Sequence, residues 1–158
     1  MTFSSWFMDE IERRLLNELQ ADAGRSVTQL AKALNLPRTT VNNRIRKLRK
    51  EKIIESYKAV LDMKKVGKPV CALVHMVITS KEGAYDIARR LKAMKNIEDV
   101  YITAGQFDII VKARFKDNEE LSKFIFDSKT GLRSWTSVEK TDSMIALDTV
   151  KENGIIWL

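Results

Sequence analysis

The sequence contains few of the residues that build disulfides, metal sites and catalytic centres. Its 158 residues include one cysteine, Cys71, and one histidine, His75. A single cysteine excludes an intrachain disulfide and a cysteine cluster for zinc. Both residues lie in an apolar segment, where we expect Cys71 to be buried and His75 to pack within a sheet. No set of serine, histidine and aspartate can then be proposed, so the sequence predicts neither a catalytic nor a metal site.

Other absences narrow the class of protein further. The chain has no Gly-x-x-x-x-Gly-Lys phosphate loop, no apolar run long enough to span a membrane and no signal-peptide pattern at its N-terminus. We therefore expect a cytoplasmic protein without a cofactor. Glutamine occurs only at positions 20, 29 and 106, whereas Lys, Arg and Glu are plentiful, which favours a thermophile.

Positive charge is concentrated in the first part of the chain. The sequence has 28 basic and 21 acidic residues, a formal net charge of +7. Residues 1–65 hold 14 basic and 8 acidic residues, whereas residues 66–158 hold 14 and 13. A polyanionic partner such as DNA is therefore expected to bind the first part.

Residues 38–50 contain six basic residues and no acidic one. Val41, Ile45 and Leu48 fall at i, i+4 and i+7, which predicts an amphipathic helix. The opposite face carries short hydrogen-bonding side chains and one arginine: Thr39, Asn42, Asn43 and Arg46. These groups are suited to reading base edges in the major groove. The alternative is an ordinary helix with a solvated basic face.

The residues before this helix predict a helix-turn-helix. Ser26 and Gln29 have the spacing of a capping box, Asn35 tolerates the left-handed conformation of a tight turn, and the fixed φ of Pro37 suits the first turn of the next helix. A further amphipathic helix at roughly 9–21 would close a three-helix core with four apolar side chains: Ile11, Leu15, Leu16 and Leu19.

The second part of the chain alternates between strand and helix patterns. The order is β-α-β-β-α-β, with elements at residues 71–78, 82–95, 100–103, 108–115, 118–129 and 137–150. We expect an α+β protein, with an N-terminal three-helix helix-turn-helix domain and a C-terminal ferredoxin-like βαββαβ domain. The expected divisions are a DNA-binding domain (1–55), a linker strand and hinge (56–69), a dimerisation and effector-binding domain (70–151) and an apolar tail (152–158).

The strand at 71–78 is apolar on both faces, although a sheet with helices on one side usually has a polar outer face. The simplest cover is the same sheet of a second copy, which predicts an isologous homodimer. Two reading helices would then match a pseudo-palindromic site in a promoter. The tail Ile155–Leu158 can dock on a neighbouring subunit or on its own domain, and the sequence does not separate these alternatives.

The chain resembles the Lrp/AsnC (feast/famine) family of transcription regulators from about Met8 to Lys151. The resemblance rests on six segments: Met8–Ile11, Leu30–Lys32, Thr40–Ile45, Leu61–Asp62, the Gly105–Asp108 loop and Ile145–Leu147. It implies dimers joined through the C-terminal domain, often assembled into octamers, with an amino acid bound between dimers near Gly105–Asp108. Two positions depart from the family, Pro37 in place of serine and Lys52 in place of glycine. A left-handed Lys52 would cost about 1 kcal/mol.

For DNA binding, the residues expected near base edges are Thr39, Thr40, Asn42, Asn43 and Arg46, and those expected at phosphates are Arg38, Lys47, Arg49 and Lys50. Arg44 lies close to the apolar stripe, so its side chain can either pack against the core or bind a phosphate.

For a small amino-acid effector, the expected residues are Thr103, Ala104, Gly105, Gln106, Asp108 and Thr141. Gly105 would let the ligand approach the backbone, with loop N–H groups binding its carboxylate and Asp108 its ammonium group. A plain hairpin turn is the alternative.

The leading interpretation is a sequence-specific DNA-binding regulator that responds to an amino acid and is not an enzyme. A low-specificity architectural DNA-binding protein is the alternative within the same class. A siroheme-decarboxylase-like enzyme would resemble the family in both halves, but the single histidine and the basic helix argue against it. The six cations in residues 38–50 argue against an effector sensor that has lost DNA binding.

Overall fold

The computed structural model describes residues 8–79 and 81–158 of the chain. Its residues group into two compact units. Of the described residues, 8–60 and Lys151–Leu158 form one unit, and those within Leu61–Val150 form the other. Within the described ranges, no helix is both long and apolar enough to cross a membrane.

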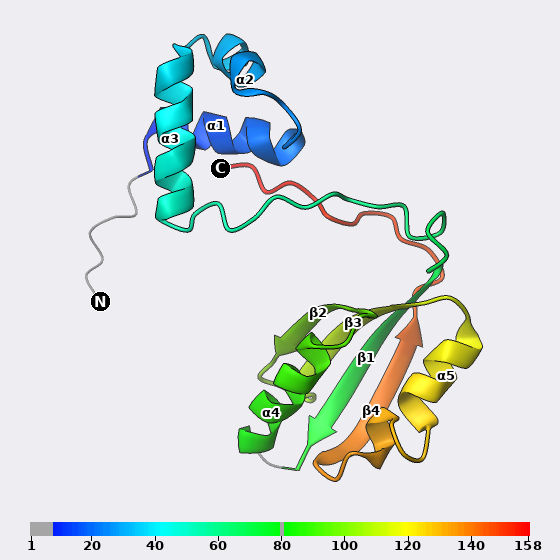
Figure 1. The fold of residues 1–158 in the computed structure, drawn as a ribbon. Coiled ribbons are helices and arrows are strands. Elements are labelled where there is room, and N and C mark those ends of the chain that lie inside the picture. The colour runs from blue at the N-terminus through cyan, green and yellow to red at the C-terminus, as the bar shows by residue number, and fades with distance from the viewer. Residues whose placement is uncertain (1–7, 80) are drawn as a thin grey trace. The chain divides into compact units, whose positions relative to one another are not determined.

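The first unit contains three helices: α1 (Glu10–Ala21), α2 (Val27–Leu34) and α3 (Arg38–Lys50) (Figure 1). Their buried core consists of Leu15, Leu16, Leu19, Leu30, Ala31, Leu34, Val41 and Leu48. The predicted three-helix core is therefore present, although Ile11 is only half-buried. Burial of the leucine and valine side chains, at about 1.5–3 kcal/mol each, supplies the main stabilisation that short helices lack on their own.

Local signals fix where these helices begin and end. The predicted capping box is present, because Ser26 Oγ accepts from the Gln29 N–H at 3.2 Å and Gln29 Oε1 accepts from the Ser26 N–H at 2.7 Å. Asn35 is left-handed with φ 54°, as predicted, and so is Lys52 with φ 58°. Pro37 was predicted in the first turn of the next helix. It instead occupies the N-cap position, one residue before α3 begins at Arg38, and its side chain does not cap the helix.

The second unit is a four-stranded antiparallel sheet with two helices, which confirms the predicted α+β class and βαββαβ order. The strand order is β2-β3-β1-β4. The elements are β1 (Val70–Ile78), α4 (Lys81–Lys92), β2 (Ile97–Ile102), β3 (Ile109–Phe115), α5 (Asn118–Phe126), a 3₁₀ turn (Leu132–Ser134) and β4 (Val138–Ile145).

Three predicted elements were too long, each for a local reason. The helix predicted to 95 ends at Lys92, where the Met94 N–H turns to the Leu91 carbonyl in a tighter i→i+3 bond. The helix predicted to 129 ends at Phe126, because Asp127 Oδ1 binds the next backbone N–H groups. The strand predicted to 150 ends at Ile145, which pairs with Ala72. One further bond joins the Ala146 N–H to the Cys71 carbonyl at 2.9 Å, and β1, which begins at Val70, offers no partner beyond residue 147 in this register.

The linker also differs from its predicted strand. Residues 56–62 form neither helix nor strand. Asp62 Oδ1 then accepts from the N–H groups of Lys64 and Lys65 at 3.1 and 3.2 Å, and Gly67 adopts φ 80° in the turn that follows. An extended segment becomes a strand only when a neighbour completes its ladder, and no described strand pairs with residues 56–69.

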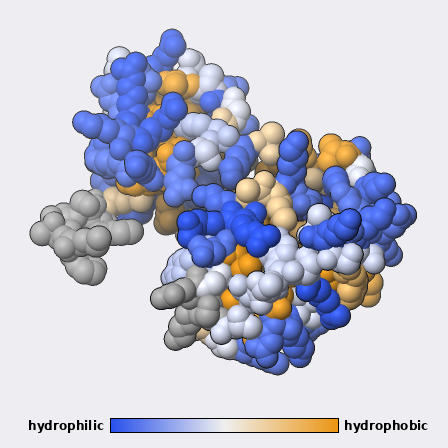
Figure 2. Space-filling view, turned by 60° about the horizontal axis from the view of Figure 1, so that its bottom comes forward, coloured by the Kyte–Doolittle hydropathy of each residue, from blue (hydrophilic) through white to orange (hydrophobic). Residues whose placement is uncertain are grey.

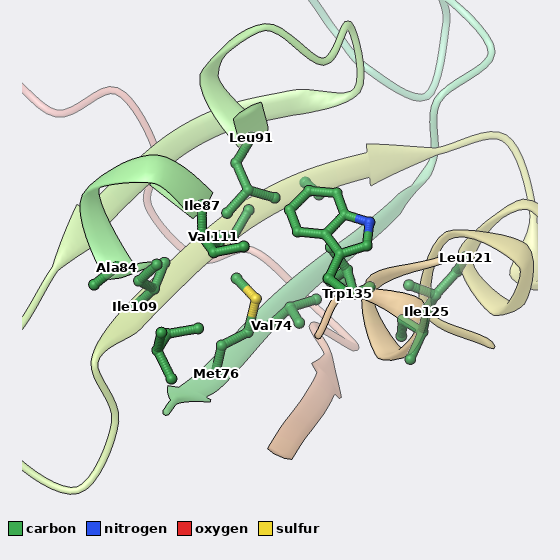
Figure 3. Packing of buried hydrophobic residues seen from close by; sticks show 14 of the residues in the cluster. Val74, Met76, Ala84, Ile87, Leu91, Ile109, Val111, Leu121, Ile125 and Trp135 are labelled. Carbon is green, nitrogen blue, oxygen red and sulfur yellow. The ribbon is translucent and has the colours of Figure 1, made fainter. Parts of the chain in front are cut away.

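The helices and the sheet enclose one apolar core. Ile87 and Leu91 of α4 and Ile125 of α5 pack on the side of the sheet that carries Val74 and Met76 (Figure 3). The helix-free face of β1 carries Cys71, Leu73, His75 and Val77. Cys71 and His75 are buried there, whereas Leu73 and Val77 are half-buried. This face of β1 is therefore largely apolar, whereas a sheet face that is exposed to solvent usually carries polar side chains.

Candidate nucleic-acid interface and effector loop

Helix α3 separates its residues into a packed stripe and a polar face. Val41 and Leu48 are buried in the helical core, and Ile45 packs against it. We define the polar face of α3 by the eight residues Arg38, Thr39, Thr40, Asn42, Asn43, Arg46, Lys47 and Lys50. Thr40 and Asn42 are half-buried and the other six are exposed. Hydrophilic residues cover most of the visible surface of the helical unit (Figure 2).

Most side chains of this polar face are available to an external partner. Among the described residues, seven of them make no side-chain hydrogen bond or ion pair: Arg38, Thr39, Thr40, Asn42, Asn43, Arg46 and Lys50. An exposed cluster of donors without acidic neighbours on its own helix is complementary to a phosphate backbone and to acceptor groups on bases. The structure thus places together the residues that the helical spacing predicted.

Lys47 and Arg44 differ from the rest, because both are engaged by α1. Lys47 Nζ lies 2.8 Å from Glu12 Oε1, and Arg44 Nη1 lies 3.4 Å from the same atom. Arg44 also donates to the Asp9 carboxylate. The side chain of Glu12 is only 5% exposed. These ion pairs hold α3 against α1. A DNA phosphate bound by Lys47, as predicted, would therefore compete with Glu12 for the Lys47 ammonium group.

The pKa shifts at this junction have the same origin. The hydrogen bond and the charge of Glu12 raise the pKa of Lys47 above its usual 10.5. The backbone N–H of Glu12 holds the pKa of Asp9 below 3.8, and Arg44 lowers it further. Asp9 and Glu12 also form a capping box on α1, which the sequence analysis missed. The Asp-x-x-Glu spacing before an apolar run was the signal that could have found it.

Arg49, also predicted at a phosphate, is exposed and close to an aromatic ring. Its guanidinium carbon lies 6.0 Å from the centroid of the Tyr57 ring. That distance is at the outer limit of a cation–π interaction. Arg49 therefore remains accessible at the end of α3.

The predicted effector residues 103–108 form the loop between β2 and β3. The Thr103 N–H donates to the Asp108 carbonyl at 2.9 Å, and Thr103 Oγ1 donates to the Phe107 carbonyl at 2.7 Å. The Asp108 N–H donates to the Met76 carbonyl at 2.9 Å, and Asp108 Oδ2 accepts from the Ile78 N–H at 2.8 Å. Thr103 thus closes the hairpin, and Asp108 fixes it to β1.

The middle of the β2–β3 loop is open. Ala104, Gly105 and Gln106 are exposed. Gly105 has φ 154°, and a Cβ built there would have no neighbour within 4 Å. This backbone conformation favours glycine at position 105. Because no other atoms crowd the α-carbon of Gly105, the loop backbone is accessible to a small ligand.

Thr141 is not directed toward this loop. It lies on β4, separated from Asp108 by β1, and its buried hydroxyl accepts from Arg133 Nε at 3.1 Å.

A separate pocket of about 460 Å³ lies between α4 and β2, lined by Tyr85, Arg89 and Ile97 among others. None of the predicted effector residues lines that pocket. Within the described ranges, no three His, Cys, Asp or Glu side chains could hold a metal ion.

Comparison with known proteins matches two parts of the chain to two family models. Residues 8–55 match the winged helix-turn-helix DNA-binding family, and residues 70–156 match the Lrp/AsnC ligand binding domain. The HTH-type transcriptional regulator FL11 of Pyrococcus horikoshii is 34% identical over 146 residues, covering 92% of this chain and 93% of FL11. An uncharacterized HTH-type transcriptional regulator of Pyrococcus abyssi is 33% identical over 147 residues, with coverage of 92% and 96%.

Solved structures share the fold. The feast or famine regulatory protein from M. tuberculosis, complexed with L-methionine, has a TM-score of 0.85 at 25% identity and covers 95% of this chain and 99% of its own. E. coli AsnC has a TM-score of 0.82 at 19% identity, with coverage of 95% and 99%.

The helix-turn-helix and the ligand-domain match define a DNA-binding transcription regulator. The chain belongs to the Lrp/AsnC family, as the resemblance implied. Its named relatives are regulators, which supports a role other than catalysis. Both of these relatives come from Pyrococcus, and a thermophilic source stays a prediction.

Proposed function

We propose that this regulator reads a specific DNA sequence with the polar face of α3 and that a small amino acid controls its binding or assembly. The observation that carries the first part is the set of seven exposed or half-buried side chains on α3 without a partner among the described residues. Such groups lose water on binding and regain hydrogen bonds only from the correct bases, which gives discrimination of about 1–3 kcal/mol for each good contact.

Two kinds of DNA contact are expected from this face. Thr39, Thr40, Asn42, Asn43 and Arg46 lie near base edges, where amides can pair with adenine and arginine with guanine. Arg38, Lys47, Arg49 and Lys50 bind phosphates and add affinity that is independent of sequence. Lys47 contributes least, because Glu12 already neutralises part of its charge.

The effector site is proposed at the β2–β3 loop. Its exposed backbone at Ala104, Gly105 and Gln106 can donate to a carboxylate, and Asp108 retains Oδ1 for an ammonium group while Oδ2 binds Ile78. Thr103 and Thr141 then act by supporting the strand ends, since both hydroxyls have internal partners. Support comes from the ligand-domain match and from the M. tuberculosis relative complexed with L-methionine.

Assembly completes the proposal. The helix-free face of β1 is apolar, and His75 stacks on Phe107 with centroids 4.8 Å apart while its buried Nδ1 has no partner in the described chain. A second copy packed on this face would cover the apolar side chains and provide a polar neighbour for His75. The resulting cytoplasmic homodimer would bind a pseudo-palindromic promoter site, with effector held between C-terminal domains in a further assembly such as an octamer.

A gel-shift titration on the protein's own promoter region tests this function. Purified protein is titrated at fixed salt against promoter DNA and against scrambled DNA of equal length, with each standard amino acid added in turn. A promoter-specific shift altered by one amino acid supports both parts. A specific shift indifferent to all of them removes the effector site and keeps DNA reading. Steep cooperative coverage of both DNAs would instead indicate an architectural protein.

A further inference from the structure

The last residues of the chain leave the sheet unit and pack with the helices. Lys151–Leu158 belong to the same compact unit as α1, α2 and α3. Asn153 is left-handed, with φ 51°, and bends the backbone just before the segment Gly154–Leu158. We call residues 155–158 the tail. It forms neither helix nor strand, so its position must depend on other contacts.

Those contacts are two pairs of hydrogen bonds to α1. Gln20 Nε2 donates to the Ile156 carbonyl at 2.9 Å, and the Ile156 N–H donates back to Gln20 Oε1 at 3.2 Å. Asn17 Nδ2 donates to the Leu158 carbonyl at 3.4 Å, and the Leu158 N–H donates to Asn17 Oδ1 at 3.0 Å. Each side-chain amide therefore binds both backbone groups of one tail residue.

The spacing explains why this arrangement is selective. Asn17 and Gln20 are three residues apart on a helix and lie on the same side of α1. Ile156 and Leu158 are two residues apart, and in an extended chain such residues present their N–H and C=O groups to the same side. The two amides thus act on the tail as the edge of a neighbouring strand would.

Side-chain chemistry also singles out these two positions. A side-chain amide offers an uncharged donor and an uncharged acceptor on two separate atoms of one planar group, as a backbone peptide group does. The chain has only three glutamines, and another of them, Gln29, caps α2. In a composition that favours Lys and Glu on the surface, a glutamine and an asparagine directed at one backbone segment indicate a binding role.

Apolar burial adds little to this contact. Ile155 is half-buried, but Ile156 is 71% and Trp157 68% exposed. The backbone hydrogen bonds must therefore supply most of the selectivity. Their release would leave no cavity in the helical core, because Leu15, Leu16 and Leu19 are buried among α2 and α3 instead.

We propose that Asn17 and Gln20 form a docking site on α1 for an extended backbone, and that its occupant is the tail of the same chain. Docking gives the helical unit a second attachment besides the linker, because the chain passes between the units at residues 60–61 and again at 150–151. The attachment acts on α1, whose Glu12 also holds α3 through Lys47. The proposal does not depend on the identity of the DNA site or the effector.

Amide hydrogen exchange followed by NMR in the full chain tests the site. The N–H groups of Ile156 and Leu158 should exchange about tenfold more slowly than in the double variant N17L/Q20L, whereas Trp157 should change less. Arg14→Leu, an exposed substitution on the same helix, is the matched control and should leave the exchange unchanged. Gln20→Glu keeps an acceptor but removes the donor, so it should release Ile156 more than Leu158.

Three outcomes would overturn the proposal. The first is exchange of both tail amides in the unmodified chain at the rate of a free peptide. The second is equal acceleration by Arg14→Leu and N17L/Q20L. The third is protection that falls on dilution, which would assign the docked tail to a second copy. Thermal melting of each variant checks that the helical unit is intact, and Gln20→Glu decides the question if N17L/Q20L unfolds.

Discussion

The polar face of α3 and the β2–β3 loop differ in how much of their hydrogen-bonding capacity the chain itself uses. On α3, Asn42, Asn43 and Arg46 make no side-chain hydrogen bond within the described residues. In the loop, Thr103 and Asp108 each bind a backbone group of the same unit. The first region is built to bind something outside the chain, and the second must first hold a hairpin in place.

This difference changes how each region should respond to substitution. Removing an unused surface group costs the folded protein little and affects only the external partner. Removing a group that satisfies a buried N–H leaves that N–H unpaired and destabilises the fold itself. Substitutions can therefore distinguish binding residues from supporting residues without knowledge of the ligand.

The largest effect is expected at Asp108. Asp108→Ala leaves the N–H of the buried residue Ile78 without its acceptor and should lower the free energy of unfolding by roughly 2–3 kcal/mol. Chemical denaturation of the sheet unit in the full chain measures the loss. Asp108→Asn, which keeps one acceptor oxygen, should cost about half as much. An Asp108→Ala variant as stable as the parent would show that the carboxylate serves only a ligand.

Arg46→Ala should leave stability unchanged and relax sequence specificity. Loss of one bidentate base contact reduces discrimination by about 1–3 kcal/mol, and roughly 2 kcal/mol is a thirtyfold change. The ratio of affinities for promoter and scrambled DNA, determined by gel shift, is the relevant quantity. A change in unfolding free energy as large as that of Asp108→Ala would remove the contrast between the two regions.

Lys50→Ala should weaken binding to every DNA alike, by about threefold to tenfold at low salt. The slope of log affinity against log salt should fall by about 1, as expected for one lost phosphate contact. Lys123→Ala, at an exposed lysine of α5 that pairs with Glu119, serves as the charge-matched control. If Arg46→Ala and Lys50→Ala lose equal affinity for promoter and scrambled DNA, the division into base and phosphate residues is wrong.

The sequence predicted the fold better than it predicted element lengths. Apolar spacing located the helices and strands, because that pattern reflects which side chains the core buries. The ends of α5 and β4 were missed, since they depend on Asp127 binding nearby N–H groups and on how far the pairing of β1 with β4 extends. Those causes lie in hydrogen bonds and strand register, which hydrophobic periodicity does not record.

Prediction of the sites was uneven for a similar reason. The polar face of α3 follows from one helix, so helical spacing alone brings its residues together. The engagement of Lys47 by Glu12 depends on how α1 packs on α3, and the partner of Thr141, Arg133, comes from the 3₁₀ turn Leu132–Ser134. Neither contact has a signal in local spacing.

The smallest effect is expected at Lys52, just beyond the end of α3. Its left-handed backbone, φ 58°, strains a side chain with a Cβ. Lys52→Gly should relieve that strain but also loosen the unfolded chain, for a net gain of roughly 0.5 kcal/mol. Thermal melting measures the gain, and Lys52→Ala is the control that removes the charge and keeps the strain. Because Lys52 lies outside both the polar face of α3 and the β2–β3 loop, the Lys52→Gly variant should discriminate promoter from scrambled DNA as the parent does. If discrimination changes, the end of α3 also positions the polar face on DNA.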